Sequence, residues 1–422
     1  MLKKVINICV EPVALAVLFY LTIIRIIFGG GWLSISGSTF EKVLPEFVLW
    51  SLVGVMFLWI AKQKKNINEY LQMWRRNWVL LGFIIFAICS MFWSEYFIAS
   101  LYKIFVLIAC SAIAAYIGKT YPSNILLRKL SWFFIIVTCI SYGLALLIPA
   151  MGTHIGYPYF GAWRGLFFHK NYLGALMAFG TIVFLLNILS AGNRLIFRLS
   201  SFCLYLLTTG LVFLSRSATG IILFAILNSG LLLVSAWVKW KNRLRRGHYI
   251  ILGILFSGLI ILTLSHLDFV FGLLNRDTTL TGRLQSWSYL INSGISTHPL
   301  FGSGFGATWV SIQFRAVTQA AIGWGFAPLS ADNGLVDVFL NLGLVGVILL
   351  ISTVLLCLFR VVRHALKEQT LISFFPLLVM IFVITANISV SFILELESFA
   401  WFLMVFALFS TTPFPLVKQA EP

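Results

Sequence analysis

The chain contains repeated runs of about 17 to 25 apolar residues, and this pattern allows few folds. A helix of that length crosses the hydrocarbon layer of a membrane and satisfies its own backbone hydrogen bonds there. Of the residues, 60% are hydrophobic and only 10% are charged, unlike a soluble domain. We therefore expect an all-α polytopic membrane protein, with residues 1–422 forming one integral domain. Twelve spans are predicted, at 9–29, 46–61, 77–93, 97–118, 130–150, 172–191, 199–215, 217–238, 249–266, 334–358, 371–391 and 397–416.

The net charge of +17 is explained by the position of the basic residues. A strongly basic chain could bind nucleic acid, but 21 of the 30 Lys and Arg residues fall in alternate loops on one side of the predicted spans. Cytoplasmic loops of membrane proteins carry such an excess, so both termini are predicted to be cytoplasmic and no nucleic-acid partner is expected. The nine others need individual explanations: Arg25, Lys42, Lys103, Arg164, Lys170, Arg216, Arg276, Arg283 and Arg315.

The cysteine and histidine residues give no sign of a metal or a cofactor. All six cysteines fall inside predicted spans, so neither a disulfide framework nor a cysteine metal site is indicated. His154, His169 and His298 lack the spacing of metal ligands. We expect no metal ion and no cofactor.

The interval 267–333 is the longest polar stretch between predicted spans, and it is named the lid segment here. Long inserts of this kind usually carry function, so we expect it to form a lid and substrate site on the outer face. Thr281 is the predicted N-cap of a short amphipathic helix lying on the membrane, with an apolar stripe of Leu284, Trp287, Leu290 and Ile291. The glycines of 302–306 are expected to allow close approach of the backbone to a ligand.

Arg283 stands in the first turn of this helix. A cation is slightly unfavourable against the positive end of the helix dipole, so its presence predicts a bound anion that faces both. Arg276 is a second candidate for substrate binding in the lid segment.

A second polar cluster lies between the fifth and sixth predicted spans. Arg164, His169, Lys170 and Asn171 stand within eight residues where a helix begins, with Asn171 as its predicted cap. They could bind an anion or a sugar, or their cations could contact lipid headgroups. Arg216 has two similar interpretations. Its guanidinium could snorkel to the lipid headgroups, or flanking hydroxyls could hold the guanidinium in position to bind a lipid phosphate.

Acidic and amide residues close the lid segment. Asp332 could cap the following helix or act as a base, and Asn333 beside it is a candidate substrate-binding residue. Asp337 lies one turn inside the span; an intramembrane carboxylate indicates function, although a salt bridge to Arg216 or Arg283 would also explain it. Glu95, Glu395 and Glu397 are further carboxylates predicted on the outer side.

Together these residues resemble the O-antigen ligase and Wzy-type polysaccharide polymerase superfamily over roughly residues 90 to 350. The His-Lys-Asn element is most similar to exopolysaccharide polymerases of the succinoglycan type. The matching elements are Trp93-Ser94, Arg-Gly-x-Phe-x-His-Lys-Asn at 164–171, Ser-Arg at 215–216, Thr-Gly-Arg-x-x-x-Trp at 281–287, His-Pro-x-x-Gly-x-Gly at 298–304, and Asp-Asn-Gly-x-x-Asp-x-x-x-x-x-Gly-x-x-Gly at 332–346.

The resemblance implies a metal-independent membrane glycosyltransferase of the GT-C class at the outer face of the bacterial inner membrane. The implied partners are a glycan donor on undecaprenyl diphosphate, a glycan or lipid acceptor, membrane lipids and a chain-length regulator protein. Such transfer needs cations on the departing diphosphate and a base for the acceptor hydroxyl, and Arg216, Arg283 and Asp332 could supply them.

One position departs from the family pattern. Ligases of the superfamily tend to carry His directly before the Asn that ends the long loop, and this chain has Asp332 there. The departure favours a polymerase over a lipid A-core ligase. A transporter or flippase is a third reading, but such proteins tend to show paired halves and polar residues at mid-membrane.

Overall fold

The computed structural model describes residues 64–156, 159–190, 194–240, 283–323, 327–392 and 399–412. The predicted spans at 9–29, 46–61 and 249–266 lie outside the described residues. So do Arg276, Thr281, Glu395 and Glu397.

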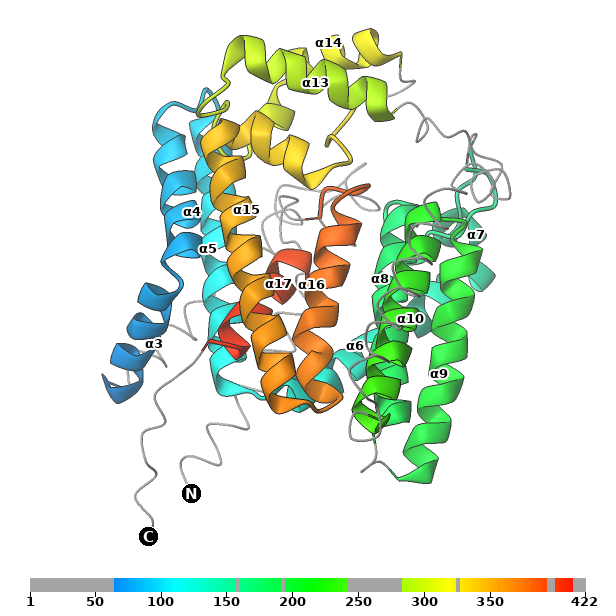
Figure 1. The fold of residues 1–422 in the computed structure, drawn as a ribbon. Coiled ribbons are helices and arrows are strands. Elements are labelled where there is room, and N and C mark those ends of the chain that lie inside the picture. Colours follow the sequence, from blue (N-terminus) through cyan, green and yellow to red (C-terminus); the bar gives the residue numbers. More distant parts are fainter. Residues whose placement is uncertain are drawn as a thin grey trace.

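The described chain is helical (Figure 1). Within it, the β structure consists of an isolated bridge between Thr153 and Trp163. The helices are α3 (Lys64–Arg76), α4 (Trp78–Cys89), η3 (Ser90–Phe92), α5 (Phe97–Thr120), α6 (Ser123–Leu147), α7 (Pro149–Gly152), α8 (Lys170–Leu189), α9 (Leu195–Leu214), α10 (Ala218–Trp240), α13 (Arg283–Thr297), η5 (Thr308–Val310), α14 (Ile312–Ile322), α15 (Gly334–Glu368), η6 (Ile372–Phe374), α16 (Phe375–Ala386) and α17 (Phe399–Ser410).

Six of the described helices are long and apolar enough to cross a membrane, namely α5, α6, α8, α9, α10 and α15. A seventh span results if Tyr70–Arg76 and Trp78–Phe92, bent by 89°, form one unit. Every predicted span that falls within the described residues overlaps an observed helix. This confirms a polytopic all-α membrane protein, while the total of twelve spans stays a prediction.

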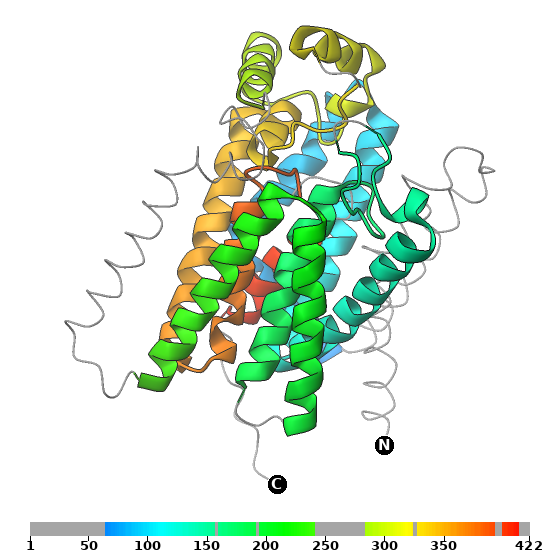
Figure 2. The ribbon, with the colours of Figure 1, turned by 90° about the vertical axis from the view of Figure 1, so that its right-hand side faces the viewer.

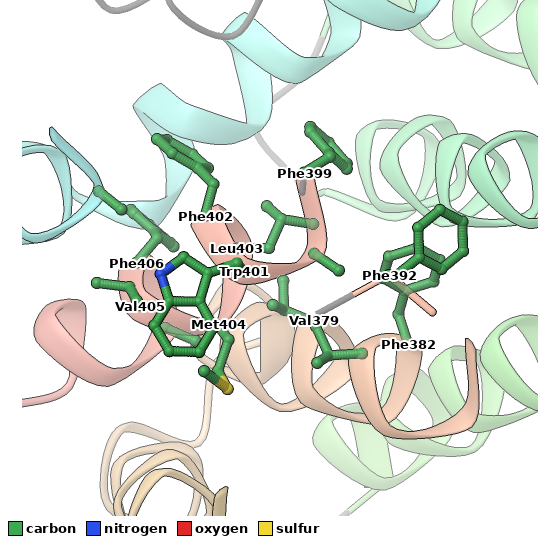
Figure 3. Packing of buried hydrophobic residues seen from close by; sticks show 14 of the residues in the cluster. Val379, Phe382, Phe392, Phe399, Trp401, Phe402, Leu403, Met404, Val405 and Phe406 are labelled. Carbon is green, nitrogen blue, oxygen red and sulfur yellow. The ribbon is translucent and has the colours of Figure 1, made fainter. Parts of the chain in front are cut away.

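Helix α17 occupies the centre of the apolar core, as the close view of its side chains shows (Figure 3). Phe399 stacks on Phe133 of α6 with ring centroids 5.4 Å apart, and the indole of Trp401 donates to Ser111 of α5 over 2.8 Å. A Cβ on Gly118 of α5 would lie 2.8 Å from the carbonyl oxygen of Phe406. The small residue therefore lets α5 and α17 pack closely, which is how helices associate in lipid.

The long helices run back and forth between two ends of the molecule. The end at the top of Figure 1, called the upper end, carries the first residues of α8, α10 and α15 and the last residues of α6, α9 and α16. Helices α13 and α14 lie across this end, as Figure 2 shows from a second direction. Lys119, Arg194, Lys239, Arg363 and Lys367 belong to the opposite, lower end. The described candidate site residues and this group of cations thus lie at opposite ends.

Candidate functional site

An ion pair joins the beginning of α13 to the turn that precedes α15. The Nη2 atom of Arg283 lies 2.9 Å from Oδ2 of Asp332. The side chain of Arg283 is 12% exposed and that of Asp332 is 38% exposed, so the carboxylate is the more accessible partner. Asp332 has a φ of +53°, a backbone conformation that few residues other than glycine adopt. A carboxylate of the chain itself thus faces Arg283, while a bound anion beside the N-terminus of this helix stays a prediction.

Asp332 is not the cap of α15. That role belongs to Asn333, whose Oδ1 accepts from the backbone N–H groups of Leu335 at 3.0 Å and Val336 at 3.2 Å. The capping interpretation of Asp332 is thus wrong, because its neighbour performs that function. The Asp332 carboxylate is directed to Arg283 instead.

Two tryptophans and a buried carboxylate hold the turn in place. The indole N–H of Trp287 donates to the carbonyl of Ala331 over 2.8 Å. The carboxylate of Asp337, which is buried, accepts from Trp309 at 2.7 Å and from the N–H of Ala331 at 3.1 Å. The predicted alternative of a salt bridge from Asp337 to Arg216 or Arg283 is therefore wrong: Asp337 positions the turn that carries Asp332.

Part of the predicted apolar stripe of α13 is buried against α15, and part of it is exposed. Leu290 is buried and Trp287 packs beside it against Val336 and Leu340 of α15, whereas Leu284 and Ile291 are exposed. Trp287 follows Arg283 by four residues, so both side chains lie on one face of α13. That face meets the Asp332 turn.

The glycine-rich loop after α13 contacts the backbone of α15. Helix α15 breaks at Gly343, where φ is +63°. The amides of Ser303 and Gly304 donate to the carbonyls of Leu340 and Asn341, over 3.0 and 2.9 Å. In return, the amides of Leu344 and Val345 donate to the carbonyls of Pro299 and Leu300.

The glycines make this contact possible. A Cβ on Gly302 would lie 2.3 Å from the carbonyl carbon of Asn341, and one on Gly343 would lie 2.3 Å from that of Leu300. Gly302 therefore has the broken turn of α15 as its close neighbour, while the approach of the 302–306 backbone to a ligand stays a prediction.

The second polar cluster surrounds the first turn of α8. His169 is its N-cap, with Nδ1 accepting from the N–H of Asn171 over 3.2 Å, so the predicted capping by Asn171 is wrong. The amide oxygen of Asn171 instead accepts from the hydroxyl of Ser217 at 3.0 Å. His154 supplies a second acceptor, since its Nε2 takes the backbone N–H of Lys170 at 3.2 Å. Two histidines thus satisfy the first amides of the helix.

His154 is suited to this role because its environment keeps the imidazole neutral. Burial, reinforced by the positive charges of Arg164 and Lys170, lowers the pKa of His154 to about 4. A neutral imidazole retains one nitrogen lone pair that can accept a hydrogen bond. No sequence pattern singles out this residue, since His154 matches no metal motif and lies outside the predicted cluster at 164–171.

Two of the cations in this cluster bind backbone carbonyls. The Nζ of Lys170, which is buried, donates to the carbonyl of Arg216 over 2.7 Å and lies 4.9 Å from the centroid of the Tyr159 ring. Arg164 donates to the carbonyls of Met151 at 2.9 Å and Ala150 at 3.1 Å. Both therefore stabilise the loops of the upper end.

Arg216 presents an exposed guanidinium in this cluster. Its φ is +49°, and its Nη1 donates to the carbonyl of Phe160 over 3.4 Å. The neighbouring hydroxyls do not hold the guanidinium as predicted, because Ser215 donates to the carbonyl of Val212 and Ser217 donates to Asn171. They fix the backbone of the turn, from which the guanidinium projects.

A short segment after α16 connects the two polar clusters. Ser389 shares a hydrogen bond of 2.7 Å with Thr219 of α10. Ser391 accepts from the backbone N–H of Asn333 at 3.0 Å, and the N–H of Gly334 donates to the carbonyl of Asn387 at 2.9 Å. Arg216, one turn from Thr219, and Asp332, next to Asn333, are therefore supported by one continuous network.

No group of three His, Cys, Asp or Glu side chains among the described residues could hold a metal ion.

Two comparisons show similarity to known proteins. Residues 203–351 match the family model described as O-antigen ligase. The exopolysaccharide production protein ExoQ of Rhizobium meliloti (strain 1021) is 23% identical over 334 residues, which cover 76% of this chain and 73% of the relative. The chain is thus similar to O-antigen ligases over residues 203–351 and to an exopolysaccharide production protein over most of its length.

Both similarities agree with the resemblance drawn from the motifs, including the similarity to exopolysaccharide proteins. The O-antigen ligase match contains Arg216, Arg283, Asp332, Asn333 and Asp337, whereas the cluster at 164–171 precedes it.

Proposed function

We propose that this chain is a GT-C type glycosyltransferase that polymerises oligosaccharide repeat units carried on undecaprenyl diphosphate. The pair of Arg283 and Asp332 beside the mouth of α15 carries the proposal, since it places a cation and a carboxylate at one point. The similarity to an exopolysaccharide production protein supports polymerisation. The reaction uses no metal ion and takes place on the periplasmic side of the bacterial inner membrane, with both termini in the cytoplasm.

The transfer breaks the bond between the anomeric carbon of the donor and its diphosphate oxygen. The diphosphate leaves with the electron pair, and the guanidinium groups of Arg283 and Arg216 stabilise its charge. The acceptor hydroxyl forms the new bond to the anomeric carbon and gives its proton to the carboxylate of Asp332. Arg164, His169, Lys170 and Asn171 keep the Arg216 turn in position, and Asn333 and Asp337 do the same for Asp332.

The Arg283–Asp332 ion pair implies an order in which the contacts of Arg283 change during the reaction. Before the donor binds, Arg283 engages the Asp332 carboxylate over 2.9 Å. A diphosphate offers the guanidinium a more highly charged partner that can accept two parallel hydrogen bonds. When Arg283 turns to the diphosphate, an oxygen of Asp332 is released to accept the proton of the acceptor.

Ligation is the second candidate, because the matching family model is described as O-antigen ligase. In a ligase the acceptor would be lipid A-core, whereas in a polymerase it is another repeat unit. Asp332 in place of the histidine that ligases tend to carry supports the polymerase.

Analysis of surface glycan from a deletion strain tests the proposal. Polymerisation predicts that long chains are lost while single repeat units persist. Long chains that stay unligated on the carrier lipid would instead identify a ligase. Purified protein that extends lipid-linked repeats without an ion gradient would exclude a transporter.

A further inference from the structure

A cavity of mixed polar and apolar lining lies beside the second half of α13, away from the Arg283–Asp332 pair. Its volume is about 220 Å³. Its walls come from the turn at 93–96, from the end of α13, from the loop at 298–308 and from the first turn of α14. The mechanism proposed above uses none of these lining residues.

Aromatic rings and hydroxyl groups line this cavity together. Trp93, Tyr96 and Phe314 contribute rings, and Ser293 is among the hydroxyl-bearing residues. Trp93 is held by Phe86 and Phe301, whose ring centroids each lie 5.9 Å from its own. Apolar C–H faces of a sugar pack on such rings, and its hydroxyls pair with groups that both donate and accept.

The charges at the cavity do not favour an anionic ligand. Among the described residues that line it, none is Lys or Arg, and the titratable side chains are Glu95, Tyr96 and His298. A phosphate or diphosphate would therefore find neither a guanidinium nor an ammonium here.

Helix α13 sets the separation between this cavity and the ion pair. Arg283 begins the helix, and the lining residues Ser293 and Thr297 follow it by ten and fourteen positions. At a rise of ~1.5 Å per residue they lie about 15–21 Å along the helix from Arg283. A glycan that reacts near Asp332 could extend along α13 to the cavity.

We propose that this cavity is a glycan-binding subsite, which takes a sugar ring several units away from the reacting end of the oligosaccharide. The inference rests on the proposed glycosyl transfer and adds to it a neutral, hydroxyl-rich ligand at a second place. Its volume is below the ~300–1,000 Å³ of sites for drug-sized ligands, which fits one ring with its neighbours outside.

Binding measurements on the full chain in lipid nanodiscs test this subsite. The probes are the oligosaccharide released by mild acid from the carrier lipid of the source cells, and undecaprenyl diphosphate without sugar. Ser293→Trp fills the cavity, and Ser296→Trp is its matched control, since Ser296 is an exposed residue of the same helix outside the lining. We expect Ser293→Trp to weaken oligosaccharide binding at least ~10-fold, while Ser296→Trp and the binding of the sugar-free carrier stay unchanged.

A second variant on another element separates loss of the subsite from distortion of α13. Tyr96→Leu removes a lining ring and hydroxyl and should also weaken oligosaccharide binding. Normal oligosaccharide binding by Ser293→Trp would overturn the subsite. It would also be overturned if Ser293→Trp and Ser296→Trp weakened oligosaccharide binding equally while Tyr96→Leu bound the oligosaccharide normally. These measurements need no turnover, so failure of the proposed transfer reaction would appear separately, as long surface glycan that persists in the deletion strain.

Discussion

The guanidinium of Arg283 holds the carboxylate of Asp332 at 2.9 Å, and the two residues stand at the starts of α13 and of the turn into α15. A second hydrogen bond supports this contact, because the indole N–H of Trp287, one turn further along α13, donates to the carbonyl of Ala331, next to Asp332. When Arg283 exchanges Asp332 for another partner, the turn that carries Asp332 therefore keeps its position.

Replacing Asp332 with Asn tests its role as the base. The amide keeps the size of the side chain but cannot accept the proton, so turnover should fall by about 100-fold or more while donor binding remains. Polymer formation by purified protein, with binding of lipid-linked donor measured separately, checks this. Glu368→Gln, the same exchange at the lower end of α15, serves as the control. Normal polymerisation by Asp332→Asn would remove Asp332 from the mechanism.

Replacing Arg216 with Ala should abolish chain growth with protein still present in the membrane. Loss of a cation that stabilises the leaving diphosphate is expected to cost about 100- to 1,000-fold in rate. Arg216→Lys should rescue poorly, because an ammonium lacks the two-pronged geometry of a guanidinium. Arg363→Ala, at the lower end, is the control. Full activity of Arg216→Ala would contradict the assignment.

Replacing Gly302 with Ala should loosen the loop from α15. The new Cβ would lie 2.3 Å from the backbone of Asn341, at a φ of +68° that L-residues rarely adopt, so we expect a loss of about 1–3 kcal/mol. Thermal unfolding in detergent measures it. Gly156→Ala is the matched control, since a Cβ there meets nothing within 4 Å. Equal melting temperatures for the two variants would refute the contact.

Acidification should weaken the start of α8 through His154. Its pKa is about 4 in the folded protein against an ordinary 6.5, so between these values the unfolded chain binds a proton that the folded chain does not. Stability contributed by neutral His154 is therefore complete above about pH 6.5 and declines as the pH falls towards 4. Unfolding measured across this range should be less pH-dependent in His154→Gln. An unchanged slope in that variant would sink the explanation.

The predicted topology can be tested with two introduced cysteines. A cysteine at Ser296, on the upper end, should react with an impermeant thiol reagent added to spheroplasts, in which the outer face of the inner membrane is accessible. A cysteine at Glu368, at the lower end, should react after the membrane is opened. The reverse pattern would place all described candidate site residues in the cytoplasm.

The span positions were predictable because apolar length is read directly from the sequence, and helices such as α8 and α10 follow the predicted limits closely. Arg283 and Asp332 were each singled out, but nothing in the sequence joins residues 49 positions apart. Capping failed as a prediction at Asn171 because the helix begins one residue earlier, at Lys170, and its cap, His169, accepts the backbone N–H of Asn171 itself. Asp337 was misread since its partners, Trp309 and Ala331, come from the lid segment, whose folding no periodicity describes.

The exchange of main-chain hydrogen bonds between the 299–304 loop and the break at Gly343 uses no side-chain atoms. Side chains in this region can therefore vary in evolution without releasing the anchor, provided that the glycines remain. At the other end of α13, the Arg283–Asp332 pair and the hydrogen bond from Trp287 to Ala331 bind its first turns to the turn before α15. Because α13 is held at both ends, we expect it to stay on α15 while substrates enter and leave, so that Arg283 changes partner by rotation of its side chain alone.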